Sequence, residues 1–440
     1  MLKRKFYDTL LKWKTTHRKE CLLVKGARQI GKTFIIDLFA RENYESYLYV
    51  NFVDHPECRE IFAGSLEAND LFQRLTGVFR NFKVVPGKTL VFLDEIQNCP
   101  KARTAFKPLA IDGRVDIIGS GSLLGLTFLD DQFKNERREA SIPVGYERQV
   151  TMFSLDFEEY LWAIGYRADV IETLRGHYEE RSSVPSVVNE KMESLFRQYM
   201  AIGGMPEVVN AFLAENSYSA AFEEQEKIVA SNLDDISKYA PTMEKPKIRA
   251  CYLSLPRHLA RENRKFKYAA VESGGSFRKF GGSVDWLRES ALVYQCFNLE
   301  QPVLPLNVYG KNECFKLYAS DVGVLTAMMG FDVKRAIVDD TLERFAKGGV
   351  YENAIMCQFV RRGYRPFYYM PRSNLSEIDF FIERDGGVVP VEVKAQRGSS
   401  VSFDEQLKRE DVRLGFKFTS GNVGVVGKKI TLPHYMTMFV

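Results

Sequence analysis

The sequence predicts an α/β protein whose N-terminal part is a parallel, doubly wound sheet. Four short apolar runs of strand length occur within residues 1–160, namely ECLLVKGAR, ESYLYVNFVD, KTLVFLDEI and VDIIGSGS. Segments with helical periodicity separate these runs, and strands that alternate with helices are typical of a parallel sheet. Residues 166–235 lack strand signals and are expected to be helical. Residues 336–440 are expected to begin with a helix and to continue with several strands.

The length and the composition limit the class of protein. A chain of 440 residues exceeds what one core usually holds, so we expect about two to four domains. No apolar run reaches the roughly 20 residues that a membrane helix needs, and the basic N-terminus lacks the apolar region of a signal peptide. The seven cysteines are scattered and form no C-x-x-C pair, which favours reduced thiols over zinc or disulfides. We therefore expect a cytoplasmic protein without a membrane partner.

A glycine-rich loop follows the first predicted strand. The segment LLVKGARQIGKTFIIDLFA contains the spacing G-x-x-x-x-G-K-T between an apolar run and a helical run, as a P-loop does. In such a loop the backbone N–H groups and the helix N-terminus point at phosphate groups. Lys32 is expected to reach the β- and γ-phosphates of ATP, and the Thr33 hydroxyl to bind Mg²⁺. The predicted nucleotide-binding residues are Gly26, Ala27, Arg28, Gln29, Ile30, Gly31, Lys32 and Thr33.

Polar residues end the third and fourth predicted core strands. Asp94 and Glu95 follow the apolar run of TLVFLDEIQ, at the edge of the sheet where open α/β folds bind ligands. We expect Asp94 to hold Mg²⁺ and Glu95 to activate the attacking water as a general base, although such a pair can also cap a helix. In IIGSGSLLG, either Ser120 or Ser122 is expected beside the γ-phosphate, unless the segment is only a glycine–serine turn.

Four arginines are candidates for an arginine finger. Arg28 lies inside the P-loop, and Arg137, Arg138 and Arg148 follow the last predicted core strand. An arginine finger acts within its own chain or across a subunit interface. The spacing does not choose among the four, and a finger supplied in trans would require a homo-oligomer.

These motifs and two later segments resemble a group of bacterial and archaeal AAA-type ATPases related to the STAND class. The later segments are IPVGYERQVTMFSLDFEEYLWA and QYMAIGGMPEVV, and the resemblance runs from about residue 15 to the C-terminus. It implies an ATPase core over residues 1–165 and a helical lid over residues 166–240. Many relatives carry Gly-Arg near Gly145, where this chain reads VGYERQ, so the resemblance does not assign the arginine finger.

The lid of STAND-type ATPases contains a G-x-P motif that touches the nucleotide base. The matching residues are Gly204 and Pro206 in GGMPEVV. The resemblance implies that both line the adenine side of the pocket. A helix-breaking turn is the alternative reading of the same two residues.

Residues 241–335 resemble the winged-helix region of the same family. Residues 241–290 contain eleven Lys or Arg and five Asp or Glu, a local excess of six positive charges. Such a patch is typical of a nucleic-acid interface, but a solvated surface explains it equally well. Arg278, Lys279 and Arg288 are available on a helix that could enter the major groove of DNA, although winged helices also serve as packing modules. Asp321 is expected to cap a helix.

The stretch SEIDFFIERDGGVVPVEVKA places charged residues on a strand face that should be buried. Its Asp-Gly pair predicts a hairpin with a two-residue type I′ turn. If Asp385 and Gly386 form the turn, Asp379 lies opposite Glu392. If the turn is one residue later, Asp379 lies opposite Lys394. Either register puts the two carboxylates and the lysine on one face, because side chains alternate along a strand.

Two carboxylates at cross-strand distance repel each other unless a cation lies between them. A divalent metal has a preference for oxygen ligands, so Asp379 and Glu392 are candidate Mg²⁺ ligands, with Lys394 beside them. The preceding helix, GGVYENAIMCQFVRRGY, contributes Glu352 on its apolar face. A carboxylate in that position is costly unless it is paired or ligates a cation.

The order of a helix Glu, a strand Asp and a strand Glu-x-Lys resembles the PD-(D/E)XK nuclease superfamily. The resemblance implies a restriction-endonuclease-like α/β domain over residues 336–440 that acts on nucleic acid, most simply DNA. The residues that would be catalytic are Glu352, Asp379, Glu392 and Lys394. The structural alternative is a sheet face with a salt bridge between Asp379 and Lys394, in which Glu352 pairs with Arg361 or Arg362.

Together these observations predict an ATP-binding protein, a Mg²⁺-dependent ATPase whose nucleotide state controls a nuclease-like domain that interacts with nucleic acid. The nucleic-acid contacts are expected from residues 241–290 and from the C-terminal domain. The alternative is a STAND-like molecular switch, in which ATP holds one conformation and an inactive C-terminal domain serves only for binding.

Overall fold

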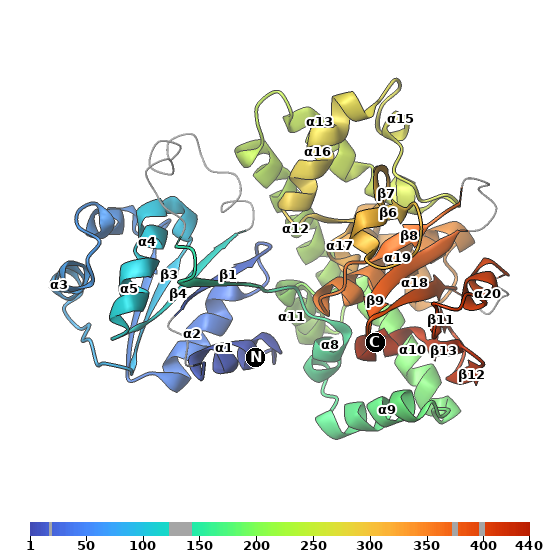
Figure 1. The fold of residues 1–440 in the computed structure, drawn as a ribbon, viewed down its shortest axis with the longest axis horizontal. Coiled ribbons are helices and arrows are strands. Elements are labelled where there is room, and N and C mark those ends of the chain that lie inside the picture. The colour runs from blue at the N-terminus through green and yellow to red at the C-terminus, as the bar shows by residue number, and fades with distance from the viewer. Residues whose placement is uncertain (17–19, 123–142, 372–376, 396–400) are drawn as a thin grey trace. The chain divides into compact units, whose positions relative to one another are not determined.

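The computed structural model describes residues 1–16, 20–122, 143–371, 377–395 and 401–440, and the chain divides into two units (Figure 1). The N-terminal unit comprises Arg4–Phe153 with Glu289–Ala291. The C-terminal unit comprises Met1–Lys3, Ser154–Arg288 and Leu292–Val440. No helix within the described ranges is long and apolar enough to cross a membrane.

The N-terminal unit contains a five-stranded sheet in which every pair of neighbours is parallel, in the order β2-β3-β4-β1-β5. All four predicted core strands form, so the predicted parallel α/β core is confirmed. Strands β3, β4 and β1 are consecutive and parallel, so their carboxyl ends lie together at one edge of the sheet. The strands are β1 (Cys21–Gly26), β2 (Ser46–Asn51), β3 (Thr89–Asp94), β4 (Asp116–Ser122) and β5 (Glu147–Thr151).

Helices cover this sheet and bury its apolar residues. Every residue of β3 is buried, as expected for a central strand of a parallel sheet. The helices of the unit are α1 (Phe6–Lys14), α2 (Lys32–Asn43), α3 (Ala68–Val78), α4 (Pro100–Thr104) and α5 (Phe106–Asp112), with short 3₁₀ turns η1 (Pro56–Phe62) and η2 (Ile96–Asn98).

The C-terminal unit begins with helices, as predicted for residues 166–235. Asp156 starts the first of them with a capping box, in which its side chain accepts from the Glu159 N–H and Glu159 accepts from the Asp156 N–H. These helices are α8 (Phe157–Ala163), α9 (Ala168–Glu180), α10 (Ser186–Ile202), α11 (Pro206–Glu215) and α12 (Tyr218–Tyr239). The helices of the predicted winged-helix region are α13 (Lys245–Leu253), α14 (Leu255–Leu259), α15 (Tyr268–Val271) and α16 (Phe277–Glu289).

An eight-stranded mixed sheet runs through the rest of this unit, in the order β12-β13-β11-β10-β9-β8-β6-β7. Its strands are β6 (Val293–Leu299), β7 (Gly310–Ala319), β8 (Phe367–Tyr369), β9 (Ile378–Arg384), β10 (Gly387–Val393), β11 (Gly415–Thr419), β12 (Gly424–Val426) and β13 (Lys429–Pro433). The hairpin β6–β7 joins β8 through β6, so the sheet continues across residue 335. The domain boundary predicted at that residue therefore crosses a continuous sheet, and both this boundary and the winged-helix assignment stay predictions.

Four further helices lie in this unit, and three of them contact the sheet while α18 packs against other helices. The longest is α19 (Arg344–Arg361), which contacts β7 and β10 and carries Glu352. The others are α17 (Val322–Met329), α18 (Phe331–Val338) and α20 (Val401–Leu407), and the chain closes with a buried 3₁₀ segment, η5 (His434–Phe439).

The buried Asp321 carboxylate accepts hydrogen bonds from several segments of the C-terminal unit. As predicted it caps a helix, because its Oδ1 accepts from the N–H groups of Gly323 and Val324 at the start of α17, at 2.9 and 3.4 Å. Its Oδ2 accepts from the Ser154 hydroxyl at 2.8 Å, and also from the Gly204 N–H and the Arg361 guanidinium. One buried carboxylate thus connects a loop, a helix start and the end of α19.

Replacement of Asp321 by Ala is expected to destabilise the protein strongly. The change removes the cap of α17 and leaves the buried Arg361 charge without its carboxylate, whose loss typically costs about 3–5 kcal/mol. Urea unfolding followed by circular dichroism measures the effect. The matched control is Asp339→Ala, which breaks an exposed pair with Arg335 at 3.8 Å and should change stability little. Equal losses for the two variants would contradict the central role of Asp321.

Candidate functional site

The P-loop connects β1 to α2 and adopts the backbone that its motif predicts. Gly31 has a φ of 85°, in the left-handed region that favours glycine, and it is the residue directly before helix α2. The first turn of α2 carries no acidic side chain. The free N–H groups and the positive end of the helix dipole therefore offer an anion site at the end of β1.

Lys32 lies within this loop and is almost completely buried. Its ammonium group donates hydrogen bonds to the carbonyls of Gly26 and Ala27, at 3.2 and 2.7 Å. Burial lowers the pKa of Lys32 to about 8, although the nearby carboxylates of Glu95 and Asp94 oppose this change. The loop carbonyls thus hold the ammonium group at a position where phosphate oxygens could replace the carbonyls as its hydrogen-bond acceptors.

The Asp94 carboxylate lies at the end of β3 and gathers four hydrogen-bond donors. Its Oδ2 accepts from the Thr33 hydroxyl at 2.8 Å and from the Tyr49 hydroxyl at 3.1 Å. Its Oδ1 accepts from the Ser120 hydroxyl and from the Glu95 N–H. The predicted Mg²⁺ ligands Thr33 and Asp94 are thus in direct contact. Ser120, which was expected beside the γ-phosphate, donates to Asp94 instead. A hydroxyl and a carboxylate in contact are hard oxygen donors and fit Mg²⁺.

Glu95 follows Asp94 in an unusual backbone conformation. Its φ of 52° is rare for a residue with a side chain, and such conformations concentrate at functional sites. The Gln97 amide donates to the Glu95 carboxylate and orients it. Neither Gln97 nor Tyr49 was predicted from the sequence. The Gln lies two residues after Glu95 in LDEIQ, and Tyr49 lies on β2 beside β3, which only the strand order reveals.

The arginine-finger candidates have different surroundings. Arg148 pairs with Glu20 at 3.0 Å within the N-terminal unit, and Arg28 is close enough to Lys32 to influence its pKa. Arg137 and Arg138 lie outside the described residues. The identity of an arginine finger therefore stays open.

Gly204 and Pro206, predicted to line the adenine side of the pocket, belong to the C-terminal unit. Pro206 is the first residue of α11, a position that suits its missing N–H group. Gly204 accepts from the Leu155 N–H at 2.7 Å and donates to Asp321, and a side chain at residue 204 would collide with Leu155. These contacts are explained by the alternative interpretation, a helix-breaking turn. The contact of Gly204 and Pro206 with a nucleotide base stays a prediction.

The C-terminal hairpin adopts the first of the two registers considered. Asp385 and Gly386 both have positive φ, at 51° and 69°, as a type I′ turn requires. Arg384 pairs with Gly387, and the ladder continues to the pair Phe380 and Val391. Asp379 is the next residue along β9, and its Oδ2 accepts from the Val393 N–H at 2.8 Å.

The three predicted residues of this hairpin are close together. Asp379 and Glu392 are buried, and Lys394 is about a third exposed. The Lys394 ammonium pairs with Glu392 Oε1 at 2.5 Å. Burial opposes the charge of Lys394, but the carboxylates of Glu392 and Asp379 outweigh it and raise the pKa of this lysine. The His434 ring also contacts the Lys394 carbonyl, at 2.9 Å from Nε2.

Glu352 is bound by cations, but not by those that the salt-bridge alternative names. Its carboxylate pairs with Arg264 and with Lys316, the latter at 3.3 Å, and accepts from the Tyr318 hydroxyl at 3.0 Å. Lys316 and Tyr318 are two residues apart on β7, so they lie on the same face of the sheet. Lys316 also pairs with Glu377.

The predicted pairing of Glu352 with Arg361 or Arg362 is wrong. These arginines follow Glu352 by nine and ten positions on the same helix, which separates them by about 14 Å along its axis. Arg361 pairs with Asp321, and Arg362 donates to the carbonyls of Met438 and Val440.

The surroundings shift the pKa values of the Glu352 and Asp379 carboxyl groups in opposite directions. Burial alone would raise the pKa of Glu352, but Arg264 and Lys316 outweigh it and hold this pKa well below its ordinary value. Burial and the charges of Glu352 and Glu392 raise the pKa of Asp379. The surroundings therefore favour the charged form of Glu352 and the protonated form of Asp379.

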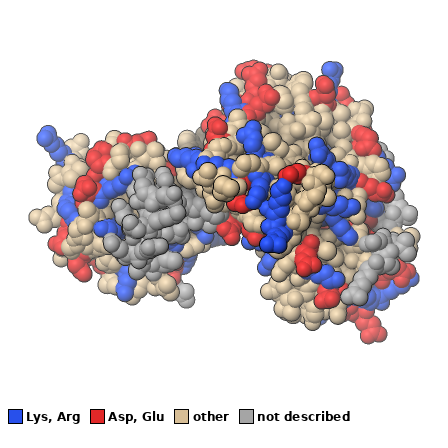
Figure 2. Space-filling view, turned by 90° about the horizontal axis from the view of Figure 1, so that it is seen from above, with Lys and Arg blue, Asp and Glu red and all other residues tan. Residues whose placement is uncertain are grey.

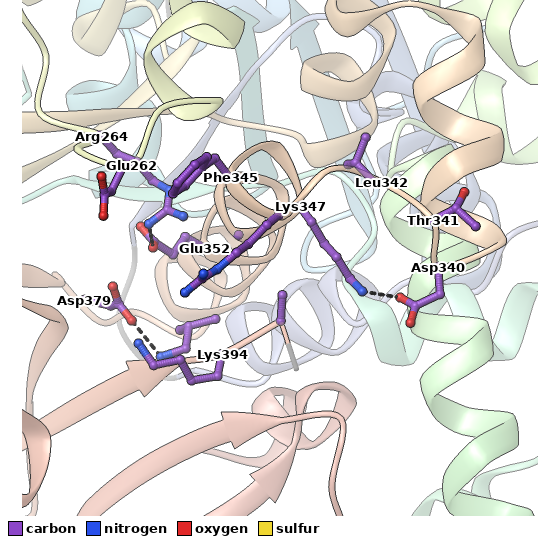
Figure 3. A pocket seen from close by; sticks show the side chains of 14 residues that line it. Glu262, Arg264, Asp340, Thr341, Leu342, Phe345, Lys347, Glu352, Asp379 and Lys394 are labelled. Carbon is purple, nitrogen blue, oxygen red and sulfur yellow. Dashed lines mark hydrogen bonds and ion pairs between the residues drawn. The ribbon is translucent and has the colours of Figure 1, made fainter. Parts of the chain in front are cut away.

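A pocket of about 830 Å³ opens onto these residues (Figure 3). Glu352, Asp379 and Lys394 line part of it. Its other lining residues include Arg264, Phe345 and Lys347, together with the acidic Glu262 and Asp340. Within the part of the chain that the structure describes, no group of three or more His, Cys, Asp or Glu is arranged as a metal site. Glu352 is committed to its cations, so only Asp379 and Glu392 remain as the metal ligands that the sequence predicts, and that role stays a prediction.

Comparison with known families divides the chain into three matched regions. Residues 18–161 match an AAA domain, and residues 193–335 and 347–433 match two domains of unknown function, DUF8612 and DUF4143. No curated protein matches the chain.

Two solved structures are similar to parts of the chain. One is a Walker-type ATPase of Pyrococcus abyssi, with 15% identity, a TM-score of 0.40, and coverage of 75% of this chain and 96% of the other. Another is PCH-2 of C. elegans, with 17% identity, a TM-score of 0.20, and coverage of 39% and 46%. Similarity at this level does not assign a function. The match of residues 18–161 to an AAA domain agrees with the P-loop geometry, and both support ATP binding by the N-terminal unit.

Proposed function

We propose that this protein is a cytoplasmic, Mg²⁺-dependent ATPase whose nucleotide state controls a nuclease-like C-terminal domain that interacts with nucleic acid. The observation that carries the ATPase assignment is the contact between the Thr33 hydroxyl and the Asp94 carboxylate beside a buried P-loop lysine. All seven cysteines are free thiols, which supports a reducing compartment.

The residues of the N-terminal unit divide the work of hydrolysis. The loop N–H groups and Lys32 bind the phosphates, and Lys32 exchanges its carbonyl partners for phosphate oxygens. Thr33 and Asp94 would hold Mg²⁺, which neutralises charge on the phosphates when it is bound. The Glu95 carboxylate, oriented by Gln97, accepts a proton from the attacking water.

The hairpin supports the nuclease-like assignment of the C-terminal domain. Its register brings Asp379 next to the strand that carries Glu392 and Lys394, on the face that α19 covers with Glu352. The two carboxylates that remain after Glu352 is paired fit one Mg²⁺, because a cation between them would remove the repulsion that raises the pKa of Asp379. Lys394 would then bind a phosphate oxygen of a phosphodiester.

The STAND-like switch remains the second candidate, and one observation favours it. Glu352 and Glu392 are already neutralised by protein cations, so the face is stable as a salt-bridged surface. In this case the C-terminal domain binds its partner without cleavage, and ATP only selects a conformation.

Residues 241–290 are the proposed second contact with nucleic acid. Helix α16 buries Phe280, Val284 and Leu287 and leaves Arg278 and Lys279 exposed. Lys and Arg side chains gather on the face of the C-terminal unit that Figure 2 shows, with acidic side chains among them. Phosphate contacts through such side chains would weaken steeply as salt increases.

ATP hydrolysis should depend on Glu95, and ATP binding on Lys32. Glu95→Gln is expected to keep ATP binding and to lower the hydrolysis rate by about 10²–10⁴-fold, because the general base is lost. Lys32→Ala should lose binding. Phosphate release and calorimetric titration measure the two properties. Glu45→Gln, an exposed glutamate paired with Lys88, is the control and should behave as wild type. Full hydrolysis by Glu95→Gln would exclude the proposed base.

ATP affinity should fall above pH 8. Burial gives Lys32 a pKa of about 8 in the free protein, so the lysine is charged below this pH and neutral above it. The charged form binds phosphate, so the dissociation constant should stay constant below pH 8 and rise by up to about tenfold per pH unit above it. Calorimetric titration from pH 7 to pH 10 tests this. The variant Lys32→Arg keeps its charge and should not show the rise.

Metal-dependent cleavage of plasmid and single-stranded DNA, with and without ATP, separates the two candidates. The nuclease proposal expects cleavage that Asp379→Ala and the double variant Glu392→Ala/Lys394→Ala abolish and that Lys32→Ala alters. The matched control is Glu405→Ala/Lys408→Ala, which removes an exposed Glu–Lys pair at the same distance of 2.5 Å. If ATP is hydrolysed and no substrate is cut, the switch is the correct function.

A further inference from the structure

The pocket beside Glu352 and Asp379 has the size of a site for a small ligand. Its volume of about 830 Å³ lies within the range of ligand pockets, so one nucleotide with part of its neighbours fits inside. Four segments of the C-terminal unit line it, namely the loop between α14 and α15 that carries Arg264, residues 340–352 at and before the start of α19, Asp379 on β9, and the end of β10.

The carboxylates lie deep in this pocket. Glu352 is 2% exposed and Asp379 is 8% exposed. A phosphodiester can reach them only if the strand enters the pocket. A duplex keeps its bases stacked inside and its backbone in a regular helix, whereas a single strand can bend and turn out its bases.

An aromatic side chain lines the pocket. Phe345, in the first turn of α19, is 37% exposed, and the Arg344 guanidinium lies 6.0 Å from the centre of its ring. Proteins that bind single strands combine such exposed rings, on which bases stack, with cations that follow the backbone. Figure 3 shows Phe345 near Arg264 and on the same pocket as Lys394 and Lys347.

We propose that this pocket takes one nucleotide of a single-stranded nucleic acid, with its base against Phe345 and its phosphate toward Lys394. The inference rests on the proposed nucleic-acid function of the C-terminal domain and names the class of substrate. Phe345 then selects single strands over duplexes. Lys394 is more exposed than Arg384, the other cation of the hairpin, and contacts the phosphate.

Fluorescence anisotropy with a labelled 12-nucleotide DNA, single-stranded or annealed to its complement, tests this. Measurements in EDTA keep the strand intact. We expect the single strand to bind more tightly than the duplex, and Phe345→Ala to weaken single-strand binding about tenfold while leaving the duplex affinity unchanged. Phe345→Tyr should restore binding, since its ring also stacks.

Phe331→Ala is the matched control. Phe331 is 40% exposed, lies on the preceding helix and packs against Phe222 at 5.4 Å between ring centres. It does not line the pocket, so its replacement should leave strand binding unchanged. A loss common to both variants would indicate a general structural effect and contradict the role of Phe345.

Two results would overturn the proposal. One is equal or tighter binding of the duplex, and the other is tighter binding of thymidine 5′-monophosphate than of the strand, which would assign the pocket to a free nucleotide. Binding is read without cleavage. If the protein binds the strand in a way that depends on Phe345 but does not cleave DNA, only the nuclease proposal is rejected. If it cleaves DNA but binding does not depend on Phe345, only the present inference is rejected.

Discussion

The Asp321 carboxylate is the constraint on which the C-terminal unit depends. A buried carboxylate is costly unless donors surround it, and here three backbone N–H groups, a hydroxyl and a guanidinium do so. These donors come from four places in the chain, at Ser154, Gly204, the start of α17 and Arg361. All these segments must therefore be in position together, and this requirement explains why glycines occupy the crowded turn at Gly203 and Gly204.

Charge compensation also stabilises the carboxylate cluster of the C-terminal hairpin and α19. Asp379, Glu392 and Glu352 are brought together by a hairpin and a helix, and the structure supplies cations from other segments. Arg264 and Lys316 neutralise Glu352, and Lys394 neutralises Glu392. The pKa of Asp379 is raised because burial and the charges of Glu352 and Glu392 outweigh the opposing charges of Lys316 and Lys394. The distribution of charge thus singles out Asp379 as the group that gains most from an added cation.

Local patterns predicted much of this structure. The P-loop, four of the five strands of the N-terminal sheet, the Asp321 cap and one of the two hairpin registers considered all follow from spacing and turn chemistry within a few residues. The partners of Glu352 were missed because Arg264 and Lys316 are 88 and 36 positions away in the chain. Tyr49 was missed for a similar reason, because only the order of strands brings it to Asp94. Tertiary neighbours of this kind leave no periodic signal in the sequence.

The continuous sheet has a consequence for how this chain can change. Strands β6 and β7 lie in the region matched by one family of unknown function, and β8 to β13 lie in the region matched by the other. A recombination event between the two regions would separate β8 from β6 and Glu352 from Lys316 at once. The exposed strand edge and the uncompensated buried charge would both disfavour the product. The two regions are therefore constrained to be inherited as a pair, whereas the P-loop unit has its own sheet and its own core.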